Sequence, residues 1–284
     1  MQSATQNATI IDSLSSLPPL PSTAQQILNA FGDEFIDADE ITEIVSDDPG
    51  ISARLLGLAN SAYYGLAEPV DSLVDAVGRV IGVETVRSVV LAIAMQKALD
   101  QSRCPAFDAE RFWKESLMAA QCCKRVALRD QGLPDHGKRL AYVTGLCHNI
   151  GLMALAYLEP EATNAVLVEH DERHMRFDKA LERAVGISHR EATMVLAQRW
   201  SLPDILVEAF RCRFDSSALA GSRLGLILVS ATAAVGNLDI EEPHKFDLTS
   251  VSKRLGMAVE DLQSMALPGE RQLEQIETLA SSMC

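Results

Sequence analysis

Residues Gly145 to Met153 read GLCHNIGLM, which places His148 directly before Asn149 inside a helical apolar run. Imidazole and carboxylate side chains hold divalent cations in phosphate-cleaving sites, so an aspartate at position 149 would give two adjacent ligands. Asparagine offers a neutral carbonyl oxygen and two amide donors, which makes it a weak cation ligand. The stretch therefore poses the question of whether metal chemistry persists here with altered ligands, or only the surrounding fold.

The composition is that of a globular protein. Of 284 residues, 48% are hydrophobic and 23% are charged. Unbroken apolar runs such as Val89 to Met95 are far shorter than the roughly 20 residues that cross a bilayer, so we expect no membrane span. Residues 1–16 contain no basic residue and no long apolar core, which indicates neither a secretory signal nor a transit peptide and favours the cytoplasm.

The net charge of −14 is concentrated at the N-terminal end. Residues 1–100 contain 4 basic and 14 acidic side chains. Nucleic-acid binding requires lysines and arginines gathered on one face. The one locally basic stretch, residues 103–139, has 8 bases and 5 acids, as a solvated helix surface would. We therefore expect no nucleic-acid partner.

The cysteines do not indicate a metal or disulfide framework. The six residues contain no C-x-x-C pair. An adjacent pair on a helix, Cys122 and Cys123, is poorly placed for a zinc site. Buried free thiols are the expected state of most of them.

Helical periodicity extends along the whole chain, and no strand-like alternation persists. Prolines begin and Gly32 ends a first helix, Asp48 and Pro49 begin another, and Gly82 interrupts residues 72–98. The helix after Gly82 is too apolar to be the DNA-reading part of a helix-turn-helix. Further helices are expected at 109–130, 138–158, 160–172, 177–200, 203–212 and 222–236, with three short ones after residue 248. The sequence therefore predicts an all-α bundle of about a dozen helices.

Six segments together resemble one known family. They are LPPLPSTAQQIL (17–28), DDPGISARLLGLANSAYYG (47–65), SLVDAVGRVIGVETVRSVVLA (72–92), FDAERFWKESLMAA (107–120), AYVTGLCHNIGLMAL (141–155) and HREATMVLAQRWSLPDILVEAF (189–210). In order and spacing they are similar to HDOD domains, the HD-related output domains of bacterial signalling proteins. The resemblance implies an HD-like bundle with a flexible tail at 1–16, an N-terminal subdomain at 17–105, an HD-like subdomain at 106–236 and a C-terminal extension at 237–284.

The resemblance also implies a degenerate metal site. HD-type phosphohydrolases hold their metal with a histidine, a His-Asp pair and a further aspartate. Here Glu115 stands at the first histidine, His148 matches the histidine of the pair, Asn149 replaces its aspartate, and His189 matches a further histidine. No final aspartate is identified, because Asp204 begins a helix and is expected to cap it. We therefore expect the fold without hydrolysis, and no metal or other cofactor.

Arg211 and Arg213 stand where related domains often carry more histidines. Pointing inward, they would repel a cation or bind an anion. For His148, three interpretations remain: a core histidine hydrogen-bonded to Glu115 or Asn149, a metal ligand, or part of an anion or nucleotide site. Correspondingly, the alternatives to a non-catalytic module are a metal-dependent phosphohydrolase that uses Glu115, His148 and an unidentified carboxylate, and a nucleotide or phosphate sensor without turnover.

The function expected from the resemblance is signal transduction through protein contacts. The implied partners are signalling proteins of a two-component or cyclic-dinucleotide pathway, with no nucleic acid or membrane involved. A run of eight acids without a base forms a candidate interaction surface for a basic partner; it comprises Asp33, Glu34, Asp37, Asp39, Glu40, Glu43, Asp47 and Asp48. Two minor expectations are a turn at NSAYYG, with Asn60 in the left-handed conformation, and four surface histidines at His136, His170, His174 and His244.

Overall fold

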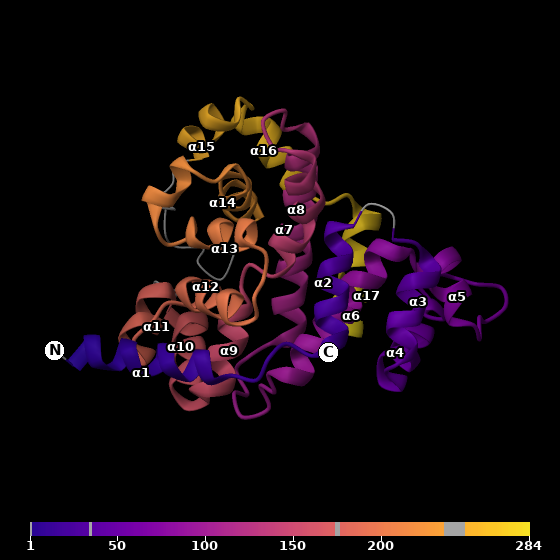
Figure 1. Ribbon diagram of the computed structural model, residues 1–284, viewed down its shortest axis with the longest axis horizontal. Coiled ribbons are helices and arrows are strands. Elements are labelled where there is room, and N and C mark those ends of the chain that lie inside the picture. The colour runs from indigo at the N-terminus through magenta and orange to yellow at the C-terminus, as the bar shows by residue number, and fades with distance from the viewer. Residues whose placement is uncertain (1, 34–35, 174–176, 236–247) are drawn as a thin grey trace. The chain divides into compact units, whose positions relative to one another are not determined.

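The structure is a computed structural model that describes residues 2–33, 36–173, 177–235 and 248–284. Within these ranges every regular element is a helix (Figure 1), which confirms the all-α class. The elements are α1 (Gln2–Ser16), α2 (Ser22–Gly32), α3 (Ala38–Ser46), α4 (Pro49–Ala59), α5 (Leu73–Asp75), η1 (Ala76–Ile81), α6 (Val83–Ala98), α7 (Ala109–Arg129), α8 (Asp135–Leu146), α9 (Ile150–Leu158), α10 (Pro160–Arg173), α11 (Phe177–Val185), α12 (His189–Arg199), α13 (Asp204–Arg211), η2 (Ser216–Ala220), α14 (Arg223–Val235), α15 (Leu248–Leu255), α16 (Val259–Ala266) and α17 (Glu270–Met283).

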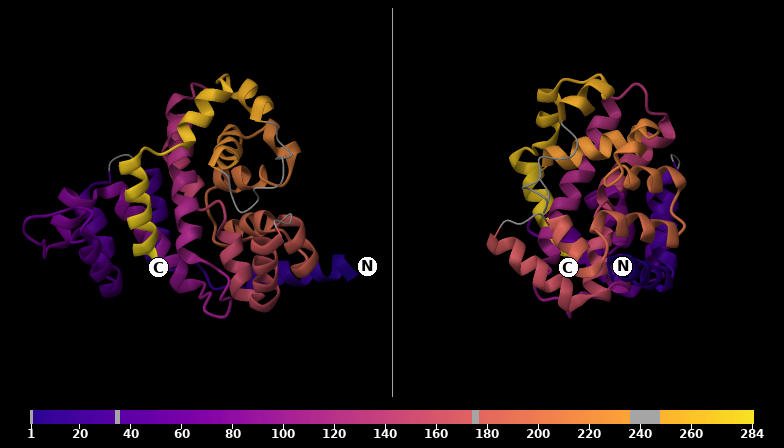
Figure 2. Two further views of the ribbon diagram at one scale, coloured as in Figure 1. Left: turned by 180° about the vertical axis from the view of Figure 1, so that it is seen from behind. Right: turned by 90° about the vertical axis from the view of Figure 1, so that its left-hand side faces the viewer.

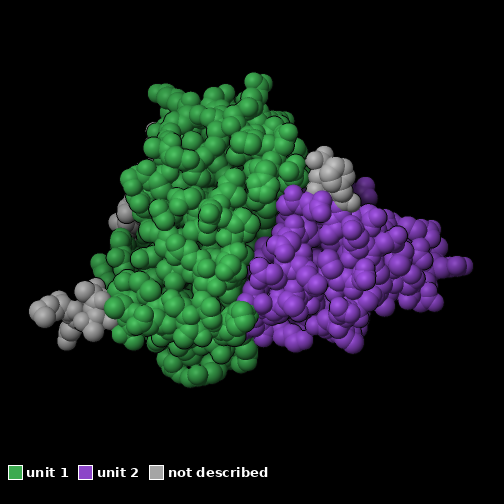
Figure 3. Space-filling model, viewed as in Figure 1, with its two compact units in different colours: residues 1–19, 99–108, 115–267 green, residues 20–98, 109–114, 268–284 purple. Residues whose placement is uncertain are grey.

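The helices form two compact units that are interleaved along the sequence (Figure 3). Unit 1 comprises residues 1–19, 99–108 and 115–267, and unit 2 comprises 20–98, 109–114 and 268–284. The domains predicted from the sequence are contiguous, with boundaries at residues 105 and 236, and so they differ from these interleaved units. The final helix belongs to unit 2, whereas α1 belongs to unit 1.

The expected flexible tail at 1–16 is instead helix α1. Its residues Ile10 and Leu14 are buried, and the helix packs against α9, α11 and α12 within unit 1. Most residues of this segment are polar, so its short apolar stripe was not recognised. Ile10 and Leu14 lie one turn apart, and burying both requires only one face of the helix.

Unit 2 begins its short helices with acidic caps. The Asp37 carboxylate accepts hydrogen bonds from the Asp39 and Glu40 amides, and Glu40 bonds back to the Asp37 amide, which is a capping box. The Asp48 side chain caps α4 by accepting from the Gly50 and Ile51 amides, and Pro49 takes the first helical position. Together with η1, a π-helix that ends at Gly82 with φ 87°, these short elements surround the apolar α6.

The turn after α4 forms, but not in the expected way. Asn60 has φ −90° and is not left-handed; Gly65 takes the positive φ instead. The Asn60 side chain closes the loop by donating to the Val70 carbonyl and accepting from the Val70 amide, both at 2.8 Å.

Unit 1 is built around α9, whose residues from Ile150 to Ala156 are all buried. Residues Asp135–Leu158, which span α8 and α9, are long and apolar enough to pass as a membrane span, contrary to the sequence expectation. However, 94% of that window is buried inside the protein, as in a core helix. Helices α15 and α16 pack against α14 in the same unit (Figure 2).

Candidate functional site

The His-Asn pair lies in a break between α8 and α9, not within one continuous helix as residues 138–158 suggested. At the break the Ile150 amide bonds to the Cys147 carbonyl and the Leu152 amide to the Asn149 carbonyl, so the chain tightens by one residue. The His148 ring nitrogen Nδ1 lies 2.6 Å from the Gly145 carbonyl oxygen. Because a carbonyl can only accept, Nδ1 carries the proton, and the ring satisfies a carbonyl at the end of α8.

Two glycines flank the pair and allow close helix packing. A Cβ on Gly145 would lie within 2.6 Å of the α7 backbone at Ala119 and Ala120, and one on Gly151 would collide with the α12 backbone at His189 and Thr193. The residues that bracket His148 and Asn149 therefore press the pair between α7 and α12.

Arg213 is the cation of the site. Its Nη1 donates to the Asn149 side-chain oxygen at 2.7 Å and to the His148 carbonyl oxygen at 2.9 Å. Arg213 and both members of the pair are buried. The guanidinium therefore binds the side chain at position 149, where the resemblance implies that an HD-type site would have its aspartate. Of the two arginines considered from the sequence, Arg213 is the one whose side chain reaches the pair.

Arg211 has the opposite environment, although it is only two residues away. It ends α13 and pairs with Glu208 at 3.4 Å, with both side chains substantially exposed. A turn follows α13, where the Arg213 amide bonds to the Phe210 carbonyl. This turn separates the two guanidinium groups, so they do not form a shared anion site.

His189 begins α12 beneath the pair. Its ring lies 5.4 Å, centroid to centroid, from the ring of Phe177, which in turn lies 5.2 Å from the His170 ring. His170 is buried, so the prediction that it lies at the surface is wrong. That prediction relied on its polar neighbours in the sequence, which do not indicate the contact with Phe177. His136 is in the described part of the chain and is exposed, whereas His174 and His244 lie outside the described residues.

Two residues of the site were missed by sequence reasoning. The Thr193 hydroxyl donates to the His189 carbonyl oxygen at 2.9 Å and accepts from the Gly151 amide at 3.0 Å, which joins α9 to α12. Its position four residues after His189, on the same helix face, was an available signal. Cys123, on α7, interacts electrostatically with Arg213; nothing in its sequence context indicated this.

Burial dominates the chemistry of the thiols. It raises the pKa of Cys123 well above its usual range, although Arg213 acts in the opposite direction. Burial also raises the pKa of Cys147, directly before the pair, to about 12. Thiols of this kind stay protonated at neutral pH and are poor nucleophiles. Five of the six cysteines are buried and free, and Cys284 is exposed.

The donors do not fit a catalytic dication. Within the residues that the structure describes, no three His, Cys, Asp or Glu side chains are grouped so that they could hold a metal ion. Glu115 is half-buried on α7, two turns before Cys123, and Asp204 is exposed in the first turn of α13. With Asn149 neutral and bound to a guanidinium, the arrangement lacks the anionic oxygen that a dication requires.

The acidic run in unit 2 divides into two groups. Asp37, Glu40 and Asp48 make the helix caps described above. Asp39, Glu43 and Asp47 are exposed, and their spacing of four residues places them along one face of α3. Asp33 is also exposed, and Glu34 lies outside the described residues.

Comparison with known proteins places this architecture. The architecture to be placed is an all-α protein with a buried His-Asn pair at a helix break. The model of the HDOD domain family matches residues 17–215. The chain therefore belongs to the HDOD domain family.

The relatives that match are distant. An uncharacterized protein of Treponema pallidum is 26% identical over 208 residues, which are 72% of this chain and 39% of that protein. A protein of proposed signal-transduction function from Marinobacter aquaeolei VT8 matches with a TM-score of 0.74 and 22% identity, over 99% of this chain and 65% of that one. The present chain thus spans less than two thirds of either protein.

Two further solved structures share the fold over nearly the whole of both chains. An HDOD domain protein of unknown function from Geobacter sulfurreducens has a TM-score of 0.68 and 21% identity, covering 99% and 97% of the two chains. A protein of proposed phosphohydrolase function from Shewanella amazonensis SB2B has a TM-score of 0.69 and 23% identity, covering 98% and 99%. At these identities the likeness shows the fold alone.

Proposed function

We propose that this chain is a non-catalytic regulatory module of cytoplasmic bacterial signal transduction, which acts through protein contacts and has an inactivated HD-type site. One observation carries the loss of catalysis: the Arg213 guanidinium donates to the side-chain oxygen of Asn149 at 2.7 Å. A residue that would be an anionic metal ligand is neutral here, and it already binds a cation.

Electrostatics gives this contact its weight. At an effective dielectric constant of about 20, a dication placed about 4 Å from the guanidinium would be repelled by roughly 8 kcal/mol. Asn149 contributes no charge to offset that repulsion, and moving Arg213 away would leave a buried charge without its hydrogen bonds. The fixed guanidinium thus supplies a positive group in the position of a metal, without a metal's ability to activate water.

The test of lost catalysis is metal content and hydrolysis in the same sample. We expect substoichiometric Mn, Fe, Ni and Zn by elemental analysis. We also expect no cleavage of p-nitrophenyl phosphate or bis-p-nitrophenyl phosphate above that of the matched variant His148→Ala, whichever of these metals is added. Metal-dependent turnover that disappears in a folded His148→Ala protein would show that the site is a phosphohydrolase centre.

A pair of variants tests the physical cause. Asn149→Asp alone restores the carboxylate but leaves it paired with Arg213, so we expect little metal binding. Adding Arg213→Met to Asn149→Asp removes the competing cation and retains much of the side-chain volume; calorimetry with Mn²⁺ should then show tighter binding than for either single variant. Equal binding by the double variant and the wild type would contradict the electrostatic argument.

The exposed acids of α3 are the surface that we assign to partner contact. Like charges at spacing i, i+4 destabilise a helix by about 0.2–0.5 kcal/mol per pair, and Asp47 lies at the unfavourable C-terminal end. The side chains of Asp39, Glu43 and Asp47 make no helix-capping contact in the structure, unlike those of Asp37, Glu40 and Asp48. A stripe that lowers helix stability without a capping role is consistent with a basic partner in a signalling pathway.

The surface is tested by charge removal in affinity capture from the native organism. We expect Asp39→Asn/Glu43→Gln/Asp47→Asn to lose a kinase, response regulator or cyclic-dinucleotide enzyme that the wild type captures. A control variant with Glu260→Gln, Asp261→Asn and Glu270→Gln removes the same number of exposed acids elsewhere and should retain it. Equal capture by both variants would exclude this stripe as the contact.

A further inference from the structure

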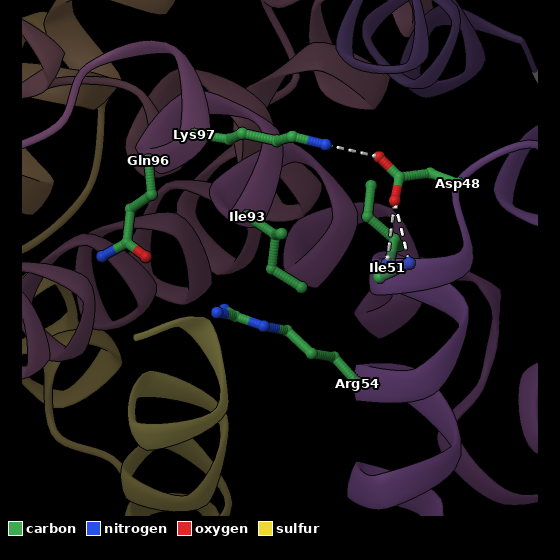
Figure 4. A pocket seen from close by; sticks show the side chains of 7 residues that line it. Asp48, Ile51, Arg54, Ile93, Gln96 and Lys97 are labelled. Carbon is green, nitrogen blue, oxygen red and sulfur yellow. Dashed lines mark hydrogen bonds and ion pairs between the residues drawn. The ribbon is translucent and has the colours of Figure 1, made fainter.

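A pocket of about 350 Å³ lies in unit 2, between the start of α4 and the end of α6. Its walls include Asp48, Ile51, Arg54, Ile93, Gln96 and Lys97 (Figure 4). The volume is at the lower end of the range for small-ligand sites. None of these residues belongs to the degenerate HD-type site in unit 1, so a ligand here neither requires nor excludes hydrolysis.

Arg54 sets the charge of the pocket. Unit 2 contains 16 acidic and 7 basic side chains, so most of its bases have acids available as partners. Arg79 pairs with Asp75 and Lys114 with Glu277. In contrast, within the described residues Arg54 makes neither a hydrogen bond nor an ion pair, and Figure 4 shows its side chain extending across the pocket towards Gln96. A guanidinium left unpaired in an acidic unit, at a cavity, is available to an anion.

The other polar groups of the pocket restrict what can bind. Asp48 already occupies the start of α4 by accepting from the Gly50 and Ile51 amides, so the helix terminus offers no site to an incoming anion. Asp48 also accepts from Lys97 at 3.2 Å. Two cations and one carboxylate leave the pocket with a single net positive charge, which matches a monoanion better than a phosphate dianion that would face Asp48.

The floor of the pocket is apolar. Ile51 and Ile93 are 2% and 7% exposed, and they belong to helices whose packing fixes them. With its amide turned so that the nitrogen faces the Met283 carbonyl, the Gln96 side chain donates to that carbonyl and accepts from the Trp113 indole nitrogen of the same unit, which fixes this wall as well. A ligand must therefore present an apolar body beside its anionic group.

We propose that this pocket binds a monoanionic carboxylate with a short apolar chain. The carboxylate lies on Arg54 and Lys97, and the apolar chain covers Ile51 and Ile93. A small branched-chain acid and the C-terminal leucine of a peptide present this same chemistry. The planar guanidinium fork suits a carboxylate because both oxygens can accept at once.

The experiment follows the Ile51 and Ile93 methyl resonances of the full chain by NMR. The probes are 4-methylpentanoate, an acetylated tetrapeptide with a C-terminal leucine carboxylate, the same peptide as its amide, and inorganic phosphate. We expect saturable shifts with at least one of the two carboxylates, and none with the amide or phosphate. Stronger binding of the peptide assigns the site to a protein chain end, and stronger binding of the acid assigns it to a metabolite.

Matched arginine variants test the assigned contact. Arg54→Gln should weaken the binding of the carboxylate by about tenfold, as expected for loss of a charge-assisted hydrogen-bond pair. Arg271→Gln is the control, because Arg271 is another exposed arginine of unit 2 and lines a different cavity; it should leave the affinity unchanged. No saturable shift with either carboxylate, equal shifts with the amide or phosphate, or equal weakening by the two variants would each overturn the proposal.

Discussion

Single residues decide what the candidate site can do. Arg211 and Arg213 have the same chemistry and nearly the same position in the chain, yet one pairs with Glu208 at the surface and the other binds Asn149 in the core. The sequence identified both arginines as neighbours of the site but could not separate them, because the orientation of a residue after a helix end depends on the turn that follows. The replacement of an aspartate by Asn149 could be recognised because its consequence is chemical and independent of geometry.

The two arginines should therefore differ in their contribution to stability. Replacing Arg213 by alanine leaves the Asn149 oxygen and the His148 carbonyl without their buried donor, which we expect to lower the free energy of unfolding by about 3 kcal/mol. Arg211→Ala removes only an exposed pair and should cost less than about 0.5 kcal/mol. Urea denaturation followed by circular dichroism measures both. Similar losses for the two variants would mean that Arg213 does not hold the pair in solution.

The ion pair between the buried Asp130 and the partly exposed Arg223 should make stability depend on pH. The Asp130 carboxylate accepts from Arg223 at 2.7 Å and from the Gly132 and Leu133 amides. Burial alone would raise the pKa of Asp130, but the hydrogen bonds and charge of Arg223, helped by the two amides, lower it below its usual value. The native pKa lies below the unfolded value of about 3.9. The stabilisation is therefore fully present above about pH 4 and is lost as the pH falls through the native pKa.

Asp130→Asn isolates this effect, because the amide has nearly the same shape but no charge. We expect the variant to be less stable than wild type by about 2 kcal/mol at pH 6, and the gap to close as wild-type Asp130 becomes protonated below pH 4. Urea denaturation at a series of pH values from 6 to 3 measures the gap. Asp135→Asn, in an exposed pair with Lys138, should show only a small gap throughout. A gap for Asp130→Asn that stays constant to pH 3 would contradict the assignment.

At the scale of elements, the sequence predicted most helices but not the break that forms the site. Periodicity reports which face of a segment is apolar, and every residue from Leu140 to Ala156, across the end of α8 and the start of α9, is buried, so no polar face marks where one helix ends. The break depends on Gly145 and Gly151, which fit against α7 and α12. Those contacts join segments far apart in the chain, and a local pattern cannot reveal them.

A methyl group on Gly151 should therefore be costly. The Cβ of Gly151→Ala would collide with the backbone at His189 and Thr193, and backbone cannot move aside as a flexible side chain can. We expect a loss of about 3 kcal/mol in the free energy of unfolding, at the upper end of overpacking costs.

Gly57, in α4, has no atom within 4 Å of a new Cβ, so Gly57→Ala should stabilise the protein by about 0.5–1 kcal/mol through helix propensity. Thermal denaturation distinguishes the two signs, and a neutral Gly151→Ala would show that α9 and α12 can separate without cost.

At the scale of the whole molecule, the family and the all-α class could be predicted because the six matching segments and the helical periodicity are carried by contiguous sequence. The units could not. The chain passes between them at residues 19, 98, 108, 114 and 267. Prolines adjoin positions 19 and 267, but a local break in the pattern does not show that the chain leaves one unit and later returns to it. Helix α1 shows the same limit, because burial of Ile10 and Leu14 depends on partners in α9, α11 and α12.

The interleaving should make unfolding cooperative across both units. Helix α7 contributes residues 109–114 to unit 2 and the rest to unit 1, so unfolding either unit removes support from one end of a continuous helix.

The two tryptophans report the units separately: Trp113 is in unit 2 and Trp200 in unit 1, and both are buried. We expect Trp113→Phe and Trp200→Phe proteins to show fluorescence transitions at the same urea concentration as the circular dichroism transition of each. Because the Trp200 indole donates to the Pro18 carbonyl, its replacement should lower the midpoint of both probes together. Two separated transitions within one variant would show that the units unfold independently, and that α7 can fray at the junction between Lys114 and Glu115.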